Sequence, residues 1–234
     1  MSQKIAFITG GNRGLGFQTA LELKNAGAKV VIGSRDPAQG KQAVAKLRAA
    51  GVDADLLQFD ITKAADAQVA FDYFNSKYGR LDILVNNAGI AGGTFPGTGP
   101  EHSAAEVSQE LLHKVFETNF FAQVALTEAL LPLLKKSPAG RIVNLSSILA
   151  SLTLQADSKS PIYNAKSFAY DASKTALNAF TRVSFTRWRG SRMVQLVIWP
   201  HSRLSVTQLV MNRGPSIARI TSNAEISLGG RAST

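Results

Sequence analysis

The stretch Thr9-Gly10-Gly11-Asn12-Arg13-Gly14-Leu15-Gly16 follows a short apolar run, Ile5 to Thr9, and leads into a helix-period stretch. Glycines here allow successive backbone N–H groups to approach a phosphate closely at the N-terminus of a helix. The spacing of Gly10, Gly14 and Gly16 differs from the common G-x-G-x-x-G fingerprint. The stretch therefore predicts a strand, a phosphate-binding turn and a helix, with a purely structural turn as the alternative.

Short apolar runs suited to buried parallel strands alternate along the chain with helix-period stretches. The expected strands are Ile5 to Thr9, Lys29 to Ser34, Ala54 to Gln58, Ile83 to Asn86, Arg141 to Ser146 and Val194 to Trp199. The expected helices are Gly14 to Ala26, Ala38 to Ala50, Ala64 to Tyr78, about Ala104 to Lys136, and Tyr170 to Trp188. This alternation predicts an α/β fold with a single-domain, Rossmann-like, doubly wound parallel sheet flanked by helices.

Composition narrows the class of protein. The 234 residues include no cysteine, which excludes a disulfide framework and thiolate zinc sites and fits a cytoplasmic location. No run approaches the roughly 20 apolar residues of a membrane span, and the apolar run near the N-terminus is too short for a signal peptide. Of the net charge of +10, residues 181–234 carry most, with eight Arg and one acidic residue. Because the rest of the chain is nearly balanced, we expect no membrane and no nucleic-acid partner.

Tyr170 and Lys174 lie four residues apart in an expected helix, so they share one face. A nearby cation favours the phenolate form, and a free phenol titrates near about pH 10. The pair therefore suits a general acid or base. An ordinary helix face is the alternative.

Three ordered motifs now carry a resemblance to a known family. TGGNRGLG is similar to the TGxxxGxG loop of the classical short-chain dehydrogenase/reductase family, NNAG at 86–89 to its motif after the fourth strand, and YDASK at 170–174 to its YxxxK. The resemblance covers roughly residues 4 to 200 and includes carbonyl reductases. It implies that residues 1–200 form a domain that binds NADP and transfers a hydride between nicotinamide and a carbonyl or alcohol substrate.

The resemblance also implies a catalytic set of Asn119, Ser147, Tyr170 and Lys174. Tyr170 is the general acid/base, Lys174 tunes it and holds the ribose, and Ser147 in Asn144-Leu145-Ser146-Ser147 binds the substrate oxygen. Asn119 resembles the family residue whose carbonyl holds a water that leads to the lysine. The alternatives are serines that merely end a strand and an Asn bonded to backbone inside a helix.

Arg13 in the phosphate loop and Arg35 after the second strand predict a preference for NADP(H), because arginine accommodates a 2'-phosphate. Asp36 beside Arg35 leaves NAD(H) open, and solvated surface charges are the alternative for both arginines. Asp60 resembles the family's adenine-contacting residue, with a helix N-cap as its alternative. The full expected cofactor set is Gly10, Asn12, Arg13, Gly14, Leu15, Gly16, Arg35, Asp60, Ile61, Asn87, Ala88, Gly89, Tyr170 and Lys174.

Two segments depart from the family pattern. Ser147 and Tyr170 are 23 residues apart, and Gln155 to Lys166 reads as a polar insertion that shapes the substrate pocket. After the sixth strand, Pro200-His201 replaces the family's Pro-Gly, and 201–234 is an atypical Arg-rich segment rather than a separate domain. One hypothesis is a divergent terminus or a frameshift that begins near Thr181. Sequencing the coding DNA tests it, because a frameshift requires an alternative frame that encodes a family-like end.

The leading interpretation is thus an NADP(H)-dependent oxidoreductase. A catalytically weak or inactive dinucleotide-binding protein with a defective substrate-covering C-terminus is the second, and a nucleic-acid binder is the third. Lone His201 reads as a surface residue, and no ligand spacing predicts a metal site. The identity of the substrate, the direction of reaction, and the choice between monomer and homo-oligomer stay open.

Overall fold

The structure is a computed structural model that describes residues 3–93, 103–187 and 194–198, and its centre is a parallel β-sheet. The strands are β1 (Ile5–Thr9), β2 (Lys29–Ser34), β3 (Ala54–Gln58), β4 (Ile83–Asn86), β5 (Arg141–Leu145) and β6 (Val194–Ile198). They lie in the order β3-β2-β1-β4-β5-β6, and every neighbouring pair is parallel. This order confirms the predicted doubly wound α/β fold, with its change of direction between β1 and β4.

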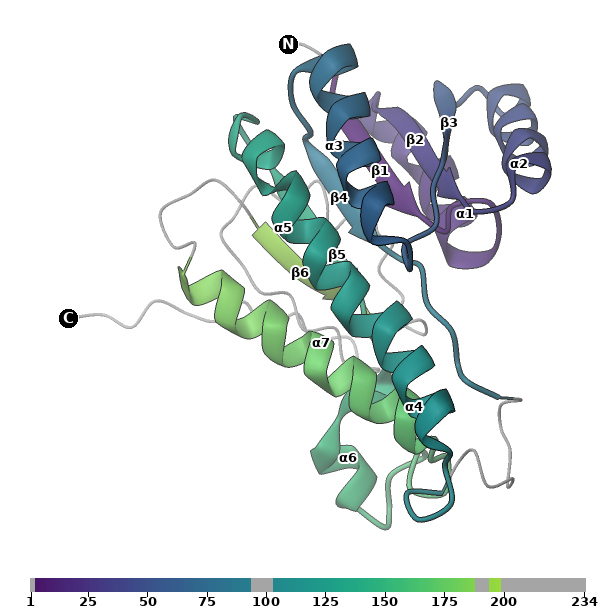
Figure 1. Cartoon of the computed structure of the whole chain (residues 1–234), viewed down its shortest axis with the longest axis vertical. Helices are drawn as coiled ribbons and strands as arrows, with labels where there is room; N and C mark the ends of the chain where they lie inside the picture. The colour runs from purple at the N-terminus through teal and green to yellow at the C-terminus, as the bar shows by residue number, and fades with distance from the viewer. Residues whose placement is uncertain (1–2, 94–102, 188–193, 199–234) are drawn as a thin grey trace.

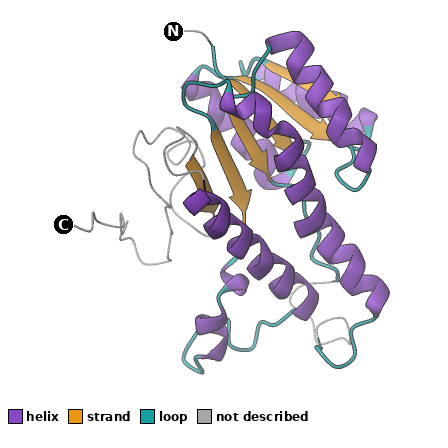
Figure 2. Ribbon diagram, turned by 60° about the vertical axis from the view of Figure 1, so that its left-hand side comes forward, coloured by secondary structure: helices purple, strands orange, loops and turns teal. Residues whose placement is uncertain are grey.

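Helices cover both faces of the sheet. The helical elements are α1 (Gly14–Leu23), η1 (Lys24–Ala26), α2 (Pro37–Ala49), α3 (Ala64–Tyr78), α4 (Gln109–Phe116), η3 (Glu117–Phe121), α5 (Ala122–Lys135), η4 (Ile148–Ala150), α6 (Leu152–Ala156) and α7 (Phe168–Arg187). Figure 1 shows α3, α5 and α7 in front of the sheet. Figure 2, turned by 60°, shows the strands among the surrounding helices.

Successive residues of one strand face different helical layers. In β1, Ile8 packs with Leu23 and Leu47 of α1 and α2, whereas Phe7 packs with Phe74 and Leu130 of α3 and α5. Because each strand is buried on both faces, its sequence is continuously apolar rather than alternating. The helical layers therefore hold the sheet rigid and leave the carboxyl ends of the strands to the connecting loops.

The expected single helix from Ala104 to Lys136 is wrong. The chain forms α4, a π-helical segment η3 and α5, and α4 begins only after Ser108, whose hydroxyl accepts a hydrogen bond from the backbone N–H of Leu111 at 3.2 Å. An apolar period near 3.6 residues continues through a π-bulge, so periodicity alone does not reveal it. The bulge matters because it contains Asn119.

Most of the remaining boundaries differ by at most two residues, but the last three residues of the expected helix Gly14 to Ala26 form the separate 3-10 helix η1. The fifth strand ends at Leu145 rather than Ser146, and α7 begins at Phe168 rather than Tyr170. The sixth strand is present through Ile198, while Trp199, Pro200, His201 and the Arg-rich segment 201–234 lie outside the described residues. Within the described ranges, no helix is long and apolar enough to cross a membrane.

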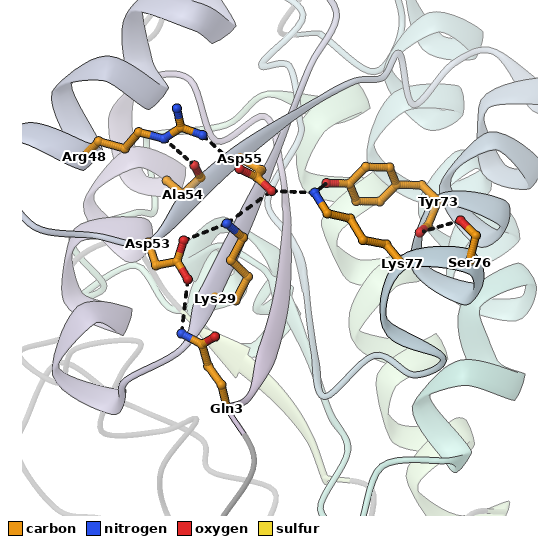
Figure 3. Close-up of polar contacts among 9 residues, drawn as sticks. All are labelled: Gln3, Lys29, Arg48, Asp53, Ala54, Asp55, Tyr73, Ser76 and Lys77. Atoms are coloured by element: carbon orange, nitrogen blue, oxygen red, sulfur yellow. Dashed lines mark hydrogen bonds and ion pairs between the residues drawn. The ribbon is translucent and has the colours of Figure 1, made fainter.

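A network of ion pairs ties the β3 edge of the sheet to two helices (Figure 3). The carboxylate of Asp55 on β3 contacts Lys29 on β2 at 3.1 Å, Arg48 on α2 at 2.9 Å and Lys77 on α3 at 2.8 Å. Partial burial by itself would raise the pKa of Asp55, but hydrogen bonds from Lys77 and Lys29 outweigh it and lower the pKa to about 2. The ionised carboxylate is therefore the form that the fold stabilises.

Replacing Asp55 by Asn is expected to lower the free energy of unfolding by about 1 kcal/mol at neutral pH, because two of its three partners are half-exposed and screened. The folded pKa of about 2 lies below the reference value of 3.8. The contribution of Asp55 is thus complete above pH 3.8 and is lost as the pH falls towards 2. Urea unfolding of both proteins between neutral and acidic pH measures this. A stability difference that stays constant down to acidic pH contradicts the assignment.

Candidate functional site

A cavity of about 1020 Å³ opens where the carboxyl ends of the strands meet the connecting loops. It lies at the switch in strand order between β1 and β4, where doubly wound sheets bind ligands. Most residues expected from the sequence line it. These are Gly10, Asn12, Arg13, Gly14, Leu15, Arg35, Asp60, Ile61, Asn87, Ala88, Gly89, Ser147, Tyr170 and Lys174. Gly16 and Asn119 do not line the cavity and act on it through neighbours.

The glycine turn between β1 and α1 forms one wall of the cavity. Gly10 and Gly14 have φ angles of 63° and 57°, a left-handed conformation that side chains disfavour. A Cβ atom on Gly16 would lie 2.5 Å from Nδ2 of Asn87, so α1 approaches the end of β4 only because this residue has no side chain. The turn therefore presents backbone at the N-terminus of α1, as a pyrophosphate requires.

Thr9 joins the glycine turn to the segment after β4. Its hydroxyl accepts hydrogen bonds from the backbone N–H groups of Asn87 and Ala88, both at 3.0 Å. The Asn87 side chain donates in return to the carbonyls of Thr9 at 2.9 Å and Gly10 at 3.2 Å. Two loops far apart in sequence are thus fixed as one wall.

Arg13 and Arg35 both line the cavity, and both are exposed. Neither guanidinium forms an ion pair with another described residue, so both are available to an anion. Asp36 caps α2 instead: its carboxylate accepts from the backbone N–H groups of Ala38 at 2.8 Å and Gln39 at 3.1 Å. The local charge that faces the cavity at this end is therefore positive.

Asp60 lines the cavity, and its alternative role as a helix N-cap is wrong. Lys63 occupies the N-cap position of α3. The Asp60 carboxylate instead accepts from the backbone N–H of Thr62 at 3.1 Å and from its hydroxyl at 2.8 Å. This turn positions Ile61 in the wall.

Ser147, Tyr170 and Lys174 meet at the other end of the cavity. Ser147 follows β5, and its hydroxyl accepts from the backbone N–H of Leu149 at 3.2 Å. Lys174 is 2% exposed; its ammonium donates to the carbonyl of Leu145 at 2.7 Å and lies 5.9 Å from the centre of the Tyr170 ring. The buried Ser146 hydroxyl has no hydrogen-bond partner among the described residues. Donors and acceptors therefore remain here for a bound molecule.

The pKa of Tyr170 shifts opposite to the direction expected from Lys174. Burial raises the pKa of Tyr170, a hydrogen bond from Ser147 partly opposes the shift, and the charge of Asp171 adds to it. Burial also lowers the pKa of Lys174 to about 8. The protein by itself thus favours a protonated Tyr170, because desolvation outweighs the hydrogen bond from Ser147.

Asn119 lies in the π-helical segment and is fully buried. Its side-chain oxygen accepts from the backbone N–H of Ile90 at 2.8 Å, and its amide donates to the carbonyl of Ile90 at 2.9 Å and to Ser173 Oγ at 3.0 Å. The side chain thus connects the loop after β4 to α7. A Cβ on Gly89 would lie 3.1 Å from the Asn119 oxygen and 3.5 Å from the Lys174 nitrogen, so Asn119 and Lys174 both pack against the backbone of Gly89.

Several wall residues were not predicted from the sequence. Ile90, Ile148 and Leu149 follow strand ends, and the segment between α6 and α7 contributes Pro161, Ile162, Ala165 and Ser167. The polar composition of Gln155 to Lys166 gives no sign that Ile162 is 7% exposed. The only available signal was the position of the insertion between Ser147 and Tyr170. Among the described residues, no group of three or more His, Asp or Glu side chains could hold a metal ion.

Comparison with known proteins identifies the family. The short chain dehydrogenase family model matches residues 4–200, and the chain therefore belongs to this family. It is 38% identical over 155 residues to carbonyl reductase 1 (NADPH) of Mus musculus, an alignment that covers 66% of this chain and 52% of that protein. It is 34% identical over 160 residues to short-chain dehydrogenase/reductase 1 of Saponaria officinalis, covering 62% and 53%. The chain thus spans about half the length of these relatives.

Solved structures with a similar fold agree with this family assignment. The RhlG/NADP active-site complex of Pseudomonas aeruginosa superposes with a TM-score of 0.70 at 28% identity, covering 92% of this chain and 78% of that one. An actinorhodin polyketide ketoreductase with NADPH gives a TM-score of 0.70 at 27% identity, covering 83% and 69%. Salutaridine reductase from Papaver somniferum gives 0.67 at 28% identity, covering 83% and 86%.

Proposed function

We propose that the protein is an NADP(H)-dependent oxidoreductase that interconverts a carbonyl and an alcohol, with Tyr170 as its general acid/base. The convergence of Ser147, Tyr170 and buried Lys174 at one end of a cavity, whose other end is formed by the glycine turn, carries this proposal. Names of relatives and structural neighbours that include NADPH or NADP support it.

The residues present fit the dinucleotide. The glycine turn suits the pyrophosphate. Arg13 and Arg35, which form no ion pair with a described residue, suit a 2'-phosphate, and Asp36 is engaged as a helix cap. Lys174 donates to only one described acceptor and has further hydrogens for ribose hydroxyls. The orphaned Ser146 hydroxyl also fits a ligand that provides its partner. These observations favour NADP(H), and NAD(H) remains the second cofactor to test.

The nicotinamide, when bound, supplies or accepts the hydride. In the reducing direction Ser147 donates a hydrogen bond to the carbonyl oxygen, where negative charge develops. The Tyr170 hydroxyl then gives its proton to that oxygen. Burial raises the pKa of Tyr170, so the proton that this step transfers is in place at neutral pH. Lys174 stabilises the phenolate that this step leaves, because the charge of the pair is then balanced.

Replacing Arg35 by Ala is expected to raise KM for NADPH about 10-fold and leave kcat and the weaker use of NADH nearly unchanged, because one charged phosphate contact is lost. Lys41→Ala on α2 is the matched control, since it removes an exposed charge that does not line the cavity. Steady-state kinetics with both cofactors measure this. Equal effects of the two substitutions would mean that only the overall charge matters.

The decisive experiment follows NADPH oxidation with a panel of aldehydes, ketones and quinones, for the intact chain and for Tyr170→Phe. Turnover that requires Tyr170 supports the proposal. Binding of NADPH without turnover of any substrate favours the second candidate, a weak or inactive dinucleotide-binding protein. The Arg-rich composition of 201–234 is the observation that keeps this candidate open. A cytoplasmic location stays a prediction, and the choice between monomer and homo-oligomer stays open.

A further inference from the structure

Ser147 and Tyr170 line the same cavity, but they are 23 residues apart in the sequence. After Ser147 the chain forms η4 and α6, runs through the loop that contributes Ile162 to the cavity wall, and returns to begin α7. Figure 1 shows α6 at the far end of the molecule from α2. A connecting segment of this length does not by itself fix the positions of its two ends. Contacts between the two ends of this segment must therefore set the distance between the Ser147 and Tyr170 hydroxyl groups.

Gln155 of α6 makes such a contact. Its side-chain nitrogen Nε2 donates to the carbonyl of Leu149 at 2.5 Å and to the Oδ2 atom of Asp171 at 2.7 Å. Leu149 lies two residues after Ser147, and Asp171 directly follows Tyr170. One amide group thus joins the two segments that carry the reacting side chains.

Both ends of this bridge are connected to the site. On one side, the N–H of Leu149 donates to the Ser147 hydroxyl at 3.2 Å, so movement of Leu149 is passed to Ser147. On the other side, Asp171 is 6% exposed and also accepts from the backbone N–H of Ser167 at 3.0 Å, at the start of α7. The charge of Asp171 acts on Tyr170. Gln155 therefore influences both the position of Ser147 and the field at Tyr170.

We propose that Gln155 is a positioning residue for the reaction, which holds Ser147 and Tyr170 in register by bridging Leu149 to Asp171. This rests on the proposed function, since it assigns a role only if Tyr170 is the general acid/base. The two hydrogens on one nitrogen are what the bridge needs, and neither glutamate nor leucine supplies them. The competing explanation is a loop staple, meaning that Gln155 only anchors the loop between α6 and α7 and has no effect on the reaction.

The fold retains a second connection at the same place. The Thr175 hydroxyl on α7 donates to the carbonyl of Ala150 at 3.2 Å. Gln155→Leu is therefore expected to fold. Its kcat for carbonyl reduction is expected to fall by about 10- to 100-fold, because small misplacement of reacting groups has effects of this size. KM for NADPH is expected to stay unchanged, since Gln155 does not line the cavity.

Two control variants separate bridging from loop anchoring. Lys166→Met removes the hydrogen bond from the Lys166 ammonium to the carbonyl of Gln155, 2.8 Å long, and leaves the bridge intact. Thr153→Ala changes an exposed residue of the same short helix. Both are expected to keep kcat close to that of the unchanged protein. An equal loss in Lys166→Met and Gln155→Leu would overturn the proposal in favour of a loop staple.

Gln155→Glu provides a test through pH. It places a second carboxylate against Asp171, and two such groups share a proton only when the pH is low enough. The activity of this variant relative to the unchanged protein is expected to rise as the pH falls towards about 5, where a shared proton restores one hydrogen bond of the bridge. A flat ratio overturns the proposal, also in the case where Gln155→Leu cannot be purified.

The two proposals fail in different ways. If Tyr170→Phe keeps turnover, the proposed function fails and with it the premise for Gln155. If Tyr170→Phe abolishes turnover while Gln155→Leu reduces as fast as the unchanged protein, only the bridging role is overturned. Measured NADPH binding by each variant confirms that the cofactor site is intact in these comparisons.

Discussion

Tyr170→Phe is expected to lower kcat for NADPH-dependent carbonyl reduction by about 10³-fold, because general acid catalysis contributes about 10²- to 10⁴-fold. The substitution removes one hydroxyl and keeps the ring. That hydroxyl bonds to Ser147 and borders the cavity, so its removal disturbs little of the packing. NADPH affinity is expected to stay within a few-fold of the unchanged protein, since Lys174 and the glycine turn are untouched.

Single-turnover kinetics and fluorescence titration with NADPH separate the chemical step from cofactor binding. Tyr163→Phe is the matched control, because Tyr163 is exposed and the residue four positions later is Ser167 rather than a lysine. Residual turnover in Tyr170→Phe within about 10-fold of the unchanged protein would show that another donor, or water, protonates the substrate oxygen.

Lys174→Met is expected to have two opposite effects. Turnover is expected to fall by about 10²-fold or more, because the cation proposed to stabilise the Tyr170 phenolate and to donate to the ribose is lost. The free energy of unfolding rises by about 1–2 kcal/mol at neutral pH, because the side chain is 2% exposed and its charge is paired with no carboxylate of the described residues. Loss of the hydrogen bond to Leu145 limits this gain.

The pH dependence of the stability difference checks its cause. Burial lowers the pKa of Lys174 from 10.5 to about 8. Below about pH 8 the folded protein carries the full cost of a buried charge; between 8 and 10.5 the unfolded chain binds more protons, so the unchanged protein gains stability as the pH rises. The advantage of Lys174→Met should therefore shrink across that window. An advantage that is absent at neutral pH, or a variant less stable than the unchanged protein, contradicts this account.

Together these two substitutions test whether the proposed active site loses folding stability in exchange for catalytic groups. Burial of the Lys174 charge beside the partly buried Tyr170 has an energetic cost in the protein alone, and in the proposed function a bound dinucleotide, with its phosphates and hydroxyl groups, offsets that cost. NADPH is accordingly expected to stabilise the unchanged protein more than Lys174→Met in thermal unfolding.

Local sequence patterns were sufficient for most of the fold. Continuous apolar runs predicted the strands, including Ile5–Thr9 and Ile83–Asn86 with correct ends, because parallel strands are buried on both faces. The glycine turn was likewise readable, since positive φ angles at Gly10 and Gly14 and the close approach at Gly16 restrict residue choice locally. The same holds for the four-residue spacing of Tyr170 and Lys174 on one helix.

Contacts between distant segments decided the rest. The hydrogen bonds of Asn119 to Ile90 and Ser173, and the bond from Gln155 to Asp171, depend on partners that no local window contains. The pKa of Tyr170 also depends on the tertiary structure. The sequence predicted that Lys174 lowers this pKa, yet burial raises it. Spacing along a helix specifies which side chains are neighbours, whereas the balance between desolvation and attraction depends on how much water the folded chain removes from both.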